Sequence, residues 1–272
     1  MAGPGEAYVH AFAPLPPGAV TPVTEGTNIH APDDVAGAIR TALDEVSPRM
    51  HAVTLILPDA LVRVFMLDFD TMPAKSAEAL SVVRFRLRKM VPFDVEPAGV
   101  SYQVLAQTEA ESKVLAAVVP GPVLAEYESA VRAAGYEPGA VLSSSLASLE
   151  AVDEMEAVMA ANLSAHAITT AITNGQDLLL YRTLDLPQEP VQRQREIQRS
   201  IAVASAYYED KLGSRPRRLR YAGVVPGPEF ARSIADPDLD IVDWVRRPDS
   251  GAMTTLPQTS FAGVAGALAG AR

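Results

Sequence analysis

The side chains of this sequence that could carry out chemistry are few, and none is arranged as a catalytic or metal site. The histidines stand far apart in the sequence, without the spacing of metal ligands, at positions His10, His30, His51 and His166. A serine run, 143–145, offers nucleophiles, but it precedes a predicted helix, where serine typically caps the first turn. Asp236, Asp238 and Asp240 alternate as in a calcium loop, but the glycine and the later glutamate of that motif are missing. The sequence therefore predicts neither catalysis nor a bound metal.

One concentration of positive charge invites a functional interpretation: the stretch RFRLRKM at 84–90, which runs into Val-Pro-Phe-Asp. The pattern predicts a helix from about Ser76 to Met90, which ends before Pro92 because proline cannot continue it. Apolar residues recur along this helix at the spacing of one helical face. We expect that face to be buried and to consist of Leu80, Val83, Leu87 and Met90.

Arg84 and Arg88 lie one turn apart on the predicted helix, and we expect both side chains to project from its exposed surface. Two interpretations are open. The cations can simply complement the dipole at the carboxyl end of the helix. Alternatively, they form a basic ledge beside an apolar groove that receives an acidic or carbonyl-rich peptide from a partner. That partner-binding surface would consist of Arg84, Leu87, Arg88, Pro92 and Phe93, and reversing both arginine charges should leave folding little changed.

The composition is that of an ordinary globular protein: of 272 residues, 48% are hydrophobic and 21% are charged. The formal net charge of -10 argues against nucleic-acid binding, because contacts to phosphate dominate such affinity. The absence of cysteine excludes disulfides and thiolate metal sites and is compatible with a reducing compartment. We find neither a signal peptide nor an apolar run of about 18 residues, so we expect a soluble, cytoplasmic protein without membrane insertion of its own.

The elements that must position these residues combine hairpins with helices, without strict strand–helix alternation. Two β-rich segments on either side of Pro58-Asp59 predict a hairpin. Asn174-Gly175 between two apolar strands predicts another, because this dipeptide favours the tight turn that joins antiparallel strands. A long helix is predicted over Gln192–Leu212, and the small residues of SFAGVAGALAG predict a closely packed final helix. These segments together indicate an α/β protein.

Taken in order, the segments resemble the PilM family, the actin-like proteins of type IV pilus assembly. The family's relatives include the cytoplasmic part of the type II secretion L protein and, more distantly, FtsA. The resemblance covers nearly the whole chain and rests on the ordered series LDFDTMP (67–73), VPFD (91–94), YQVL (102–105), KVLAAVVPGPVLAEYESAVRAAGYEPGAV, GQDLLLYRTLDL, EIQRSIAVASAYYEDKLG and FAGVAGALAG.

The resemblance implies an actin-like (ribonuclease H-like) fold of two lobes. Residues 1–68 would form the first lobe, 69–142 an inserted α+β subdomain, and 143–272 the second lobe with its closing helix. The family's nucleotide site begins with an Asp-x-Gly turn in a first N-terminal hairpin. We expect that hairpin to be missing here, because the start of this sequence resembles the family's later segments.

The other nucleotide motifs of the family are altered in this sequence. Asn162 and Ser164 stand where the resemblance places the aspartate and glycine of a second phosphate-binding turn. Gly223 and Gly227 survive in a third, adenosine-side turn, although they can equally mark a simple strand-to-helix turn. The resemblance therefore implies a degenerate nucleotide site, without ATPase activity or a bound cofactor. A functional site for ATP with Mg²⁺ is the alternative.

The function implied by the resemblance is that of a non-enzymatic scaffold at the cytoplasmic face of the inner membrane. Its partner would be the cytoplasmic N-terminal tail of a PilN-like membrane protein, with other proteins of the pilus platform as further partners. The chain would thus be peripheral at the membrane through that partner. The alternatives are an ATP-binding protein of the same machinery and an FtsA-like cytoskeletal protein.

Overall fold

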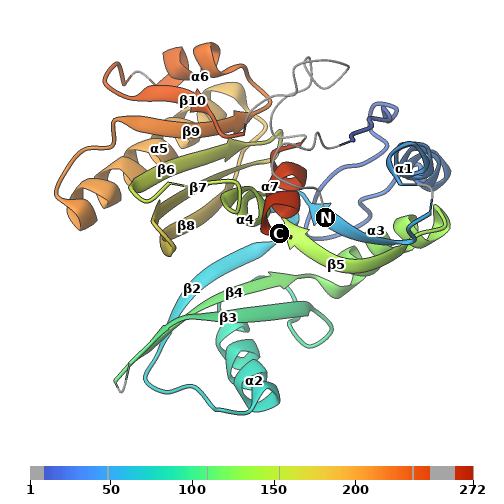
Figure 1. Ribbon diagram of the computed structural model, residues 1–272, viewed down its shortest axis with the longest axis horizontal. Helices are drawn as coiled ribbons and strands as arrows, with labels where there is room; N and C mark the ends of the chain where they lie inside the picture. The colour runs from blue at the N-terminus through green and yellow to red at the C-terminus, as the bar shows by residue number, and fades with distance from the viewer. Residues whose placement is uncertain are drawn as a thin grey trace.

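The computed structural model of the protein describes residues 9–271, with residues 48, 109, 153, 235 and 246–260 excepted. The strands among these residues form three sheets, of two, three and five strands. Figure 1 shows the five-stranded sheet at the upper left, the three-stranded sheet at the bottom and the two-stranded sheet towards the right. We call the bodies built on them the second lobe, the insert and the first lobe.

The first lobe is built on a parallel pair of strands. The pair is β1 (Ala52–Leu57) and β5 (Glu137–Ser143), and the helices packed on it are α1 (Pro32–Val46) and α3 (Gly121–Ala133). A small apolar core lies between helices and strands and includes Ala36, Val131, Ala134 and Tyr136. Before α1, one isolated bridge joins Val20 to Ile29.

The predicted hairpin around Pro58-Asp59 is wrong. After β1 the chain makes a 3₁₀ turn, η1 (Asp59–Leu61), and continues as β2 (Arg63–Phe69), which pairs antiparallel with β4 (Ser112–Val119) of the insert. All residues of η1 are buried, whereas the turn of a tight hairpin lies in solvent. The connection therefore carries the chain from one sheet to another.

The insert is the antiparallel sheet β2-β4-β3, with β3 (Gly99–Gln107) at one edge and α2 (Ser76–Leu87) on one face. Its sheet begins at Arg63, inside the range predicted for the first lobe (1–68). Conversely, α3 and β5, which fall in the predicted subdomain 69–142, pack in the first lobe. The division of the chain into three units remains a prediction.

The buried face of α2 differs from the predicted one. Val83 and Leu87 are fully buried, and Ala79 joins them at the same four-residue spacing. Leu80 is only half-buried, and Met90 is exposed because the helix ends at Leu87. The predicted spacing assumed a helix continuing through Met90, and the earlier end removes that residue from the face.

The second lobe carries the sheet β10-β9-β6-β7-β8. Its strands are β6 (Ala157–Leu163), β7 (Ala167–Asn174), β8 (Asp177–Asp185), β9 (Arg218–Gly223) and β10 (Asp240–Asp243). The Asn174-Gly175 hairpin is confirmed, with Gly175 at a positive φ of 57°. Helices α5 (Pro190–Leu212) and α6 (Gly227–Ile234) cover one face, over a core that includes Met159, Ile172, Ile201 and Phe230.

Two short helices, α4 (Ser144–Leu149) and α7 (Ala262–Gly270), lie between the two lobes (Figure 1). They approach closely because α7 presents glycines to α4: a Cβ placed on Gly266 would lie 1.9 Å from the carbonyl oxygen of Ala147. The expected closely packed final helix is confirmed. In the described part of the chain, no helix is long and apolar enough to cross a membrane.

Candidate functional site

Three of the four predicted nucleotide-site residues lie together at one end of the second-lobe sheet. Strands β6 and β9 are parallel neighbours, and Leu163 is paired with Gly223. The next residue along, Val224, donates its backbone N–H to the Leu163 carbonyl oxygen at 2.9 Å. Because parallel strands end at the same edge, Asn162 and Gly223 near the ends of β6 and β9 lie close to Ser164 in the turn after β6.

The β6–β7 turn satisfies its own backbone donors. The hydroxyl oxygen of Ser164 accepts hydrogen bonds from the N–H groups of His166 at 3.2 Å and Ala167 at 2.9 Å. The backbone N–H of Ser164 itself donates to the Ala167 carbonyl oxygen at 2.9 Å. A phosphate-binding turn needs backbone N–H groups that point at the ligand. In this turn a serine side chain already holds two of them.

Arg193 holds the same turn from the start of α5. Its guanidinium donates to the carbonyl oxygens of Ser164 and Ala165, both at 2.8 Å. Partial burial lowers the pKa of Arg193 from its ordinary value. Glu189 caps this end of α5 by accepting from the N–H groups of Val191 and Gln192. The turn and the adjacent helix terminus are therefore bonded within the protein.

The surviving Gly223 is explained by a neighbouring tyrosine. A Cβ on Gly223 would lie 1.8 Å from the Tyr221 hydroxyl, which donates to the Val225 carbonyl oxygen at 2.9 Å. The Tyr221 ring stacks on Phe230 with 4.1 Å between ring centres, and burial raises its pKa. A folded-back tyrosine fills the turn, so this glycine fits the interpretation of a strand-to-helix turn.

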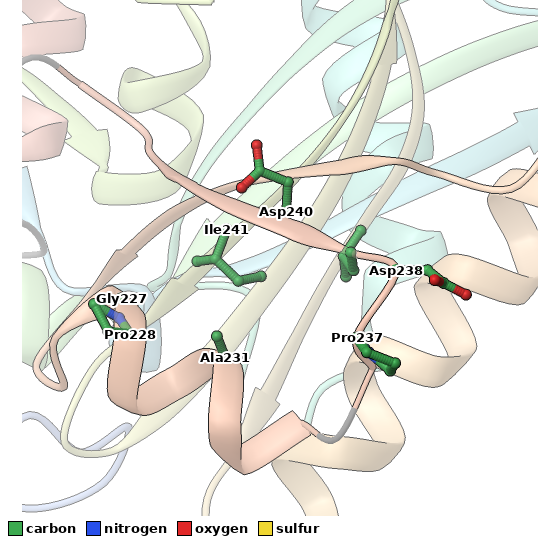
Figure 2. Close-up of a pocket in the computed structure, with 8 residues that line it drawn as sticks. Gly227, Pro228, Ala231, Pro237, Asp238, Asp240 and Ile241 are labelled. Atoms are coloured by element: carbon green, nitrogen blue, oxygen red, sulfur yellow. The ribbon is translucent and has the colours of Figure 1, made fainter.

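Gly227 lies apart from the other three residues, at the start of α6. It borders a shallow pocket of about 360 Å³ between α6 and β10. In Figure 2, Ala231 and Ile241 face each other across this pocket, whereas the carboxylate of Asp240 points away from α6. The pocket lining contains no cation, and its charged residues are both aspartates, so it does not suit a phosphate group, because like charges repel.

The centre of the candidate site is Asp59, a residue that the sequence analysis treated only as part of a turn. Asp59 is 5% exposed, and its carboxylate accepts five hydrogen bonds. Oδ1 accepts from the Ser143 hydroxyl at 2.7 Å and from the Ser145 N–H at 2.9 Å. Oδ2 accepts from the Ser145 hydroxyl, from Asn162 Nδ2 at 3.2 Å and from Thr169 Oγ1 at 3.1 Å.

A second ring of hydroxyl groups surrounds this carboxylate. The Ser143 hydroxyl lies 3.2 Å from the Tyr181 hydroxyl, and Thr169 Oγ1 lies 2.9 Å from Thr183 Oγ1. Burial, followed by the negative charge of Asp59, raises the pKa of Tyr181 well above its ordinary value. The residues come from η1, β5, α4, β6, β7 and β8, so the cluster spans the contact between the two lobes.

The described residues do not fit a functional site for ATP with Mg²⁺, which was the alternative expectation. A carboxylate has about four lone-pair positions, and the five donors around Asp59 leave none for a cation or its water shell. Asn162 is 3% exposed and directs its amide N–H₂ to Asp59 and Ser145. No cluster of acidic or histidine side chains within the described ranges could hold a metal ion.

The predicted partner-binding residues have mostly structural contacts. Arg84 donates from Nη1 to the carbonyl oxygens of Val95 at 2.5 Å and Ala98 at 3.1 Å, so its expected exposure is wrong. Both carbonyl groups belong to the loop between α2 and β3. Arg88 is exposed, as predicted, and forms an ion pair with Glu96 of the same loop.

The apolar residues of the predicted surface also differ in their exposure. Leu87 is fully buried and cannot contact a partner, whereas Phe93 is half-buried and Pro92 is exposed. The residue that the sequence analysis missed is Phe85, with 63% of its surface exposed and the Lys89 ammonium 5.8 Å from its ring centre. The sequence could have indicated this exposure, because a phenylalanine that lies outside the apolar face of an amphipathic helix points outward.

No protein-family model matches the sequence, and no curated protein matches it. Among solved structures, the chain is similar to one described as a PilM-PilN type IV pilus biogenesis complex. That similarity has a TM-score of 0.68 and 18% identity over 95% of this chain and 90% of the other. A weaker similarity, with a TM-score of 0.48, is to the cytoplasmic domain of EpsL, an inner membrane component of the Vibrio cholerae type II secretion system. It has 15% identity over 86% of this chain and 80% of that one. The predicted PilM-like, actin-like fold is confirmed by the first of these structures.

Proposed function

We propose that this chain is a non-enzymatic, PilM-like scaffold that binds the cytoplasmic N-terminal tail of a PilN-like membrane protein. One observation carries the proposal: nearly the whole chain shares its fold with a chain of a structure described as a PilM-PilN complex. The partner would place the scaffold at the inner membrane, where other proteins of a pilus or related secretion platform could bind it.

The hydrogen bonding of the candidate site supports a role without ATP turnover. Ser164 takes up N–H groups of the turn that would hold phosphate, and Asp59 has no free lone pair for Mg²⁺. Calorimetry with Mg-ATP, together with a phosphate-release assay, tests this part of the proposal. We expect neither binding nor turnover. A dissociation constant in the low micromolar range would favour the alternative of an ATP-binding protein of the same machinery.

We place the docking surface on the outward face of α2, because that face presents apolar side chains beside positive charge. Val82 and Phe85 are exposed one turn apart, and Lys89 lies over the Phe85 ring. Of the predicted surface, Arg88 and Pro92 are exposed, whereas Leu87 is buried and the half-buried Arg84 is bonded to the insert itself. An apolar anchor beside a cation suits a peptide with one apolar side chain and a nearby carboxylate.

Fluorescence anisotropy tests this surface with a labelled synthetic peptide that carries the cytoplasmic N-terminal tail of a PilN-like protein. Phe85→Ser should weaken binding more than tenfold, a change of about 1.4 kcal/mol or above. Val203→Ser is the matched control, since Val203 is an exposed apolar residue on a helix of the other lobe and its loss should leave affinity unchanged. Absence of any binding to the unmodified chain would contradict the scaffold proposal. Equal affinities of both variants would contradict only the location on α2.

A further inference from the structure

Asp59 joins groups from both lobes. Ser143 ends β5 and Ser145 lies in the first turn of α4, on the first-lobe side. Asn162 and Thr169 lie on β6 and β7 of the second-lobe sheet. The Asp59 Oδ1 atom accepts hydrogen bonds only from the two serines. The Oδ2 atom accepts from one serine and from both second-lobe side chains. The carboxylate therefore lies at the contact between the two lobes and is hydrogen-bonded to both of them.

We infer that Asp59 is a built-in clasp that fixes the orientation of the two lobes without a bound nucleotide. All five donors to its carboxylate are neutral groups, so the charge is stabilised by hydrogen bonding alone. A rotation of the lobes too small to admit water would break the bonds from Asn162 and Thr169 and leave a buried carboxylate short of partners. A buried charge that loses its partners is strongly destabilised, so the closed arrangement is favoured.

An apolar seam beside the clasp keeps water away from it. Leu57 and Leu61 of the first lobe and Val64 of the insert form one buried cluster with Ala171 and Tyr181 of the second-lobe sheet. Hydrogen bonds in such a dry environment are stronger than in water, and water cannot readily replace the lost donors. The apolar cluster and the Asp59 hydrogen bonds therefore act together. Only the hydrogen bonds fix the angle between the lobes, because their strength depends on angle.

Distance measurement between the lobes tests the clasp. The chain contains no cysteine, so two introduced cysteines can be spin-labelled without further changes. Ser129→Cys on α3 and Ala206→Cys on α5 are exposed positions, one in each lobe. Double electron–electron resonance then reports the distribution of inter-lobe distances.

Asp59→Asn is the test variant, since it keeps the shape of the side chain and removes the charge. Asp185→Asn is its control, since Asp185 is itself exposed and its ion pair with Arg63 joins the second lobe to the insert, not to the first lobe.

We expect a single narrow distribution in the labelled parent chain, unchanged by millimolar Mg-ATP. Asp59→Asn should broaden it and lower the melting temperature by roughly 5 °C or more, whereas Asp185→Asn should change neither. If Asp59→Asn does not fold, Thr169→Val carries the test, because it removes one second-lobe donor at nearly constant volume and should also broaden the distribution. An unchanged distribution in the folded test variant, or narrowing of the parent distribution by Mg-ATP, would overturn the clasp. The result is independent of whether a PilN-like peptide binds.

Discussion

The guanidinium group of Arg84 reaches from α2 across the insert to the carbonyl oxygen of Val95, at 2.5 Å, and holds the loop that returns the chain to β3. Val95 is itself buried in the insert core with Val83 and Leu87. This arginine thus links the helix, the loop and the core, although its sequence context is that of a solvated basic helix.

Arg84→Ala should therefore destabilise the insert. Hydrogen bonds to charged groups contribute about 1.5–3 kcal/mol each, and the variant leaves the carbonyl oxygens of Val95 and Ala98 without this donor. Thermal unfolding followed by circular dichroism measures the loss. Arg88→Ala is the matched control, one turn further along, because its exposed ion pair with Glu96 contributes at most about 1 kcal/mol. Equal melting temperatures for the two variants would contradict a structural role for Arg84.

Gly266→Ala should separate α7 from α4. The added Cβ would lie 1.9 Å from the Ala147 carbonyl oxygen, and a backbone group cannot rotate away from it. We expect a loss of about 1–3 kcal/mol or more in the free energy of unfolding, measured by urea denaturation. Gly37→Ala, also within a helix but with nothing within 4 Å of the added atom, should instead stabilise by about 0.5–1 kcal/mol. A neutral effect at Gly266 would show that α7 does not pack as described.

Glu126→Ala should loosen the segment before α1. The Glu126 carboxylate accepts from the backbone N–H groups of Asn28, at 3.0 Å, and Ile29, at 2.7 Å. Removing it leaves these part-buried donors unsatisfied, at about 1–3 kcal/mol. Hydrogen exchange should show faster exchange at both amides. Glu128→Ala on the same helix removes only an ion pair with Arg132 and should leave this exchange rate unchanged.

The buried Tyr181 should make stability fall in alkaline solution. Its folded-state pKa is raised, by burial and then by the charge of Asp59, above the unfolded value of about 10. The folded chain thus keeps a proton that the unfolded chain releases. The contribution is fully present below about pH 10 and is lost as the pH rises beyond it. Tyr181→Phe, which has no proton to release, should give a shallower decline of unfolding free energy between about pH 9 and pH 11. An identical slope would contradict the shift.

Local patterns in the sequence predicted much of the fold, including the Asn174-Gly175 hairpin and the long helix α5. The pairing of strands that lie far apart in the sequence was harder to predict. The strands flanking Pro58 were located correctly, but nothing within the segment indicates that β1 pairs with β5 and β2 with β4. A short connection between two β-rich segments looks the same whether the strands pair with each other or diverge.

The candidate site shows the same limit. Asn162, Ser164 and Gly223 were found through the family resemblance, and the structure places them together. Asp59 was missed because its donors lie 84 to 110 residues away in the sequence, so no local motif marks it. Arg84 was assigned to the surface for the same reason, since its partners belong to a loop whose return path depends on the tertiary fold.

The parallel pairing of β1 with β5 has a consequence for synthesis of the chain. A ribosome releases β1 first, but its partner begins only at Glu137, after all three strands of the insert. The β2-β4-β3 sheet can close as soon as Val119 has emerged, whereas β1 must wait with its hydrogen-bonding edge unpaired. The insert is therefore the first sheet able to form during translation. Its closure brings the chain back towards β1, which shortens the search of β5 for its partner.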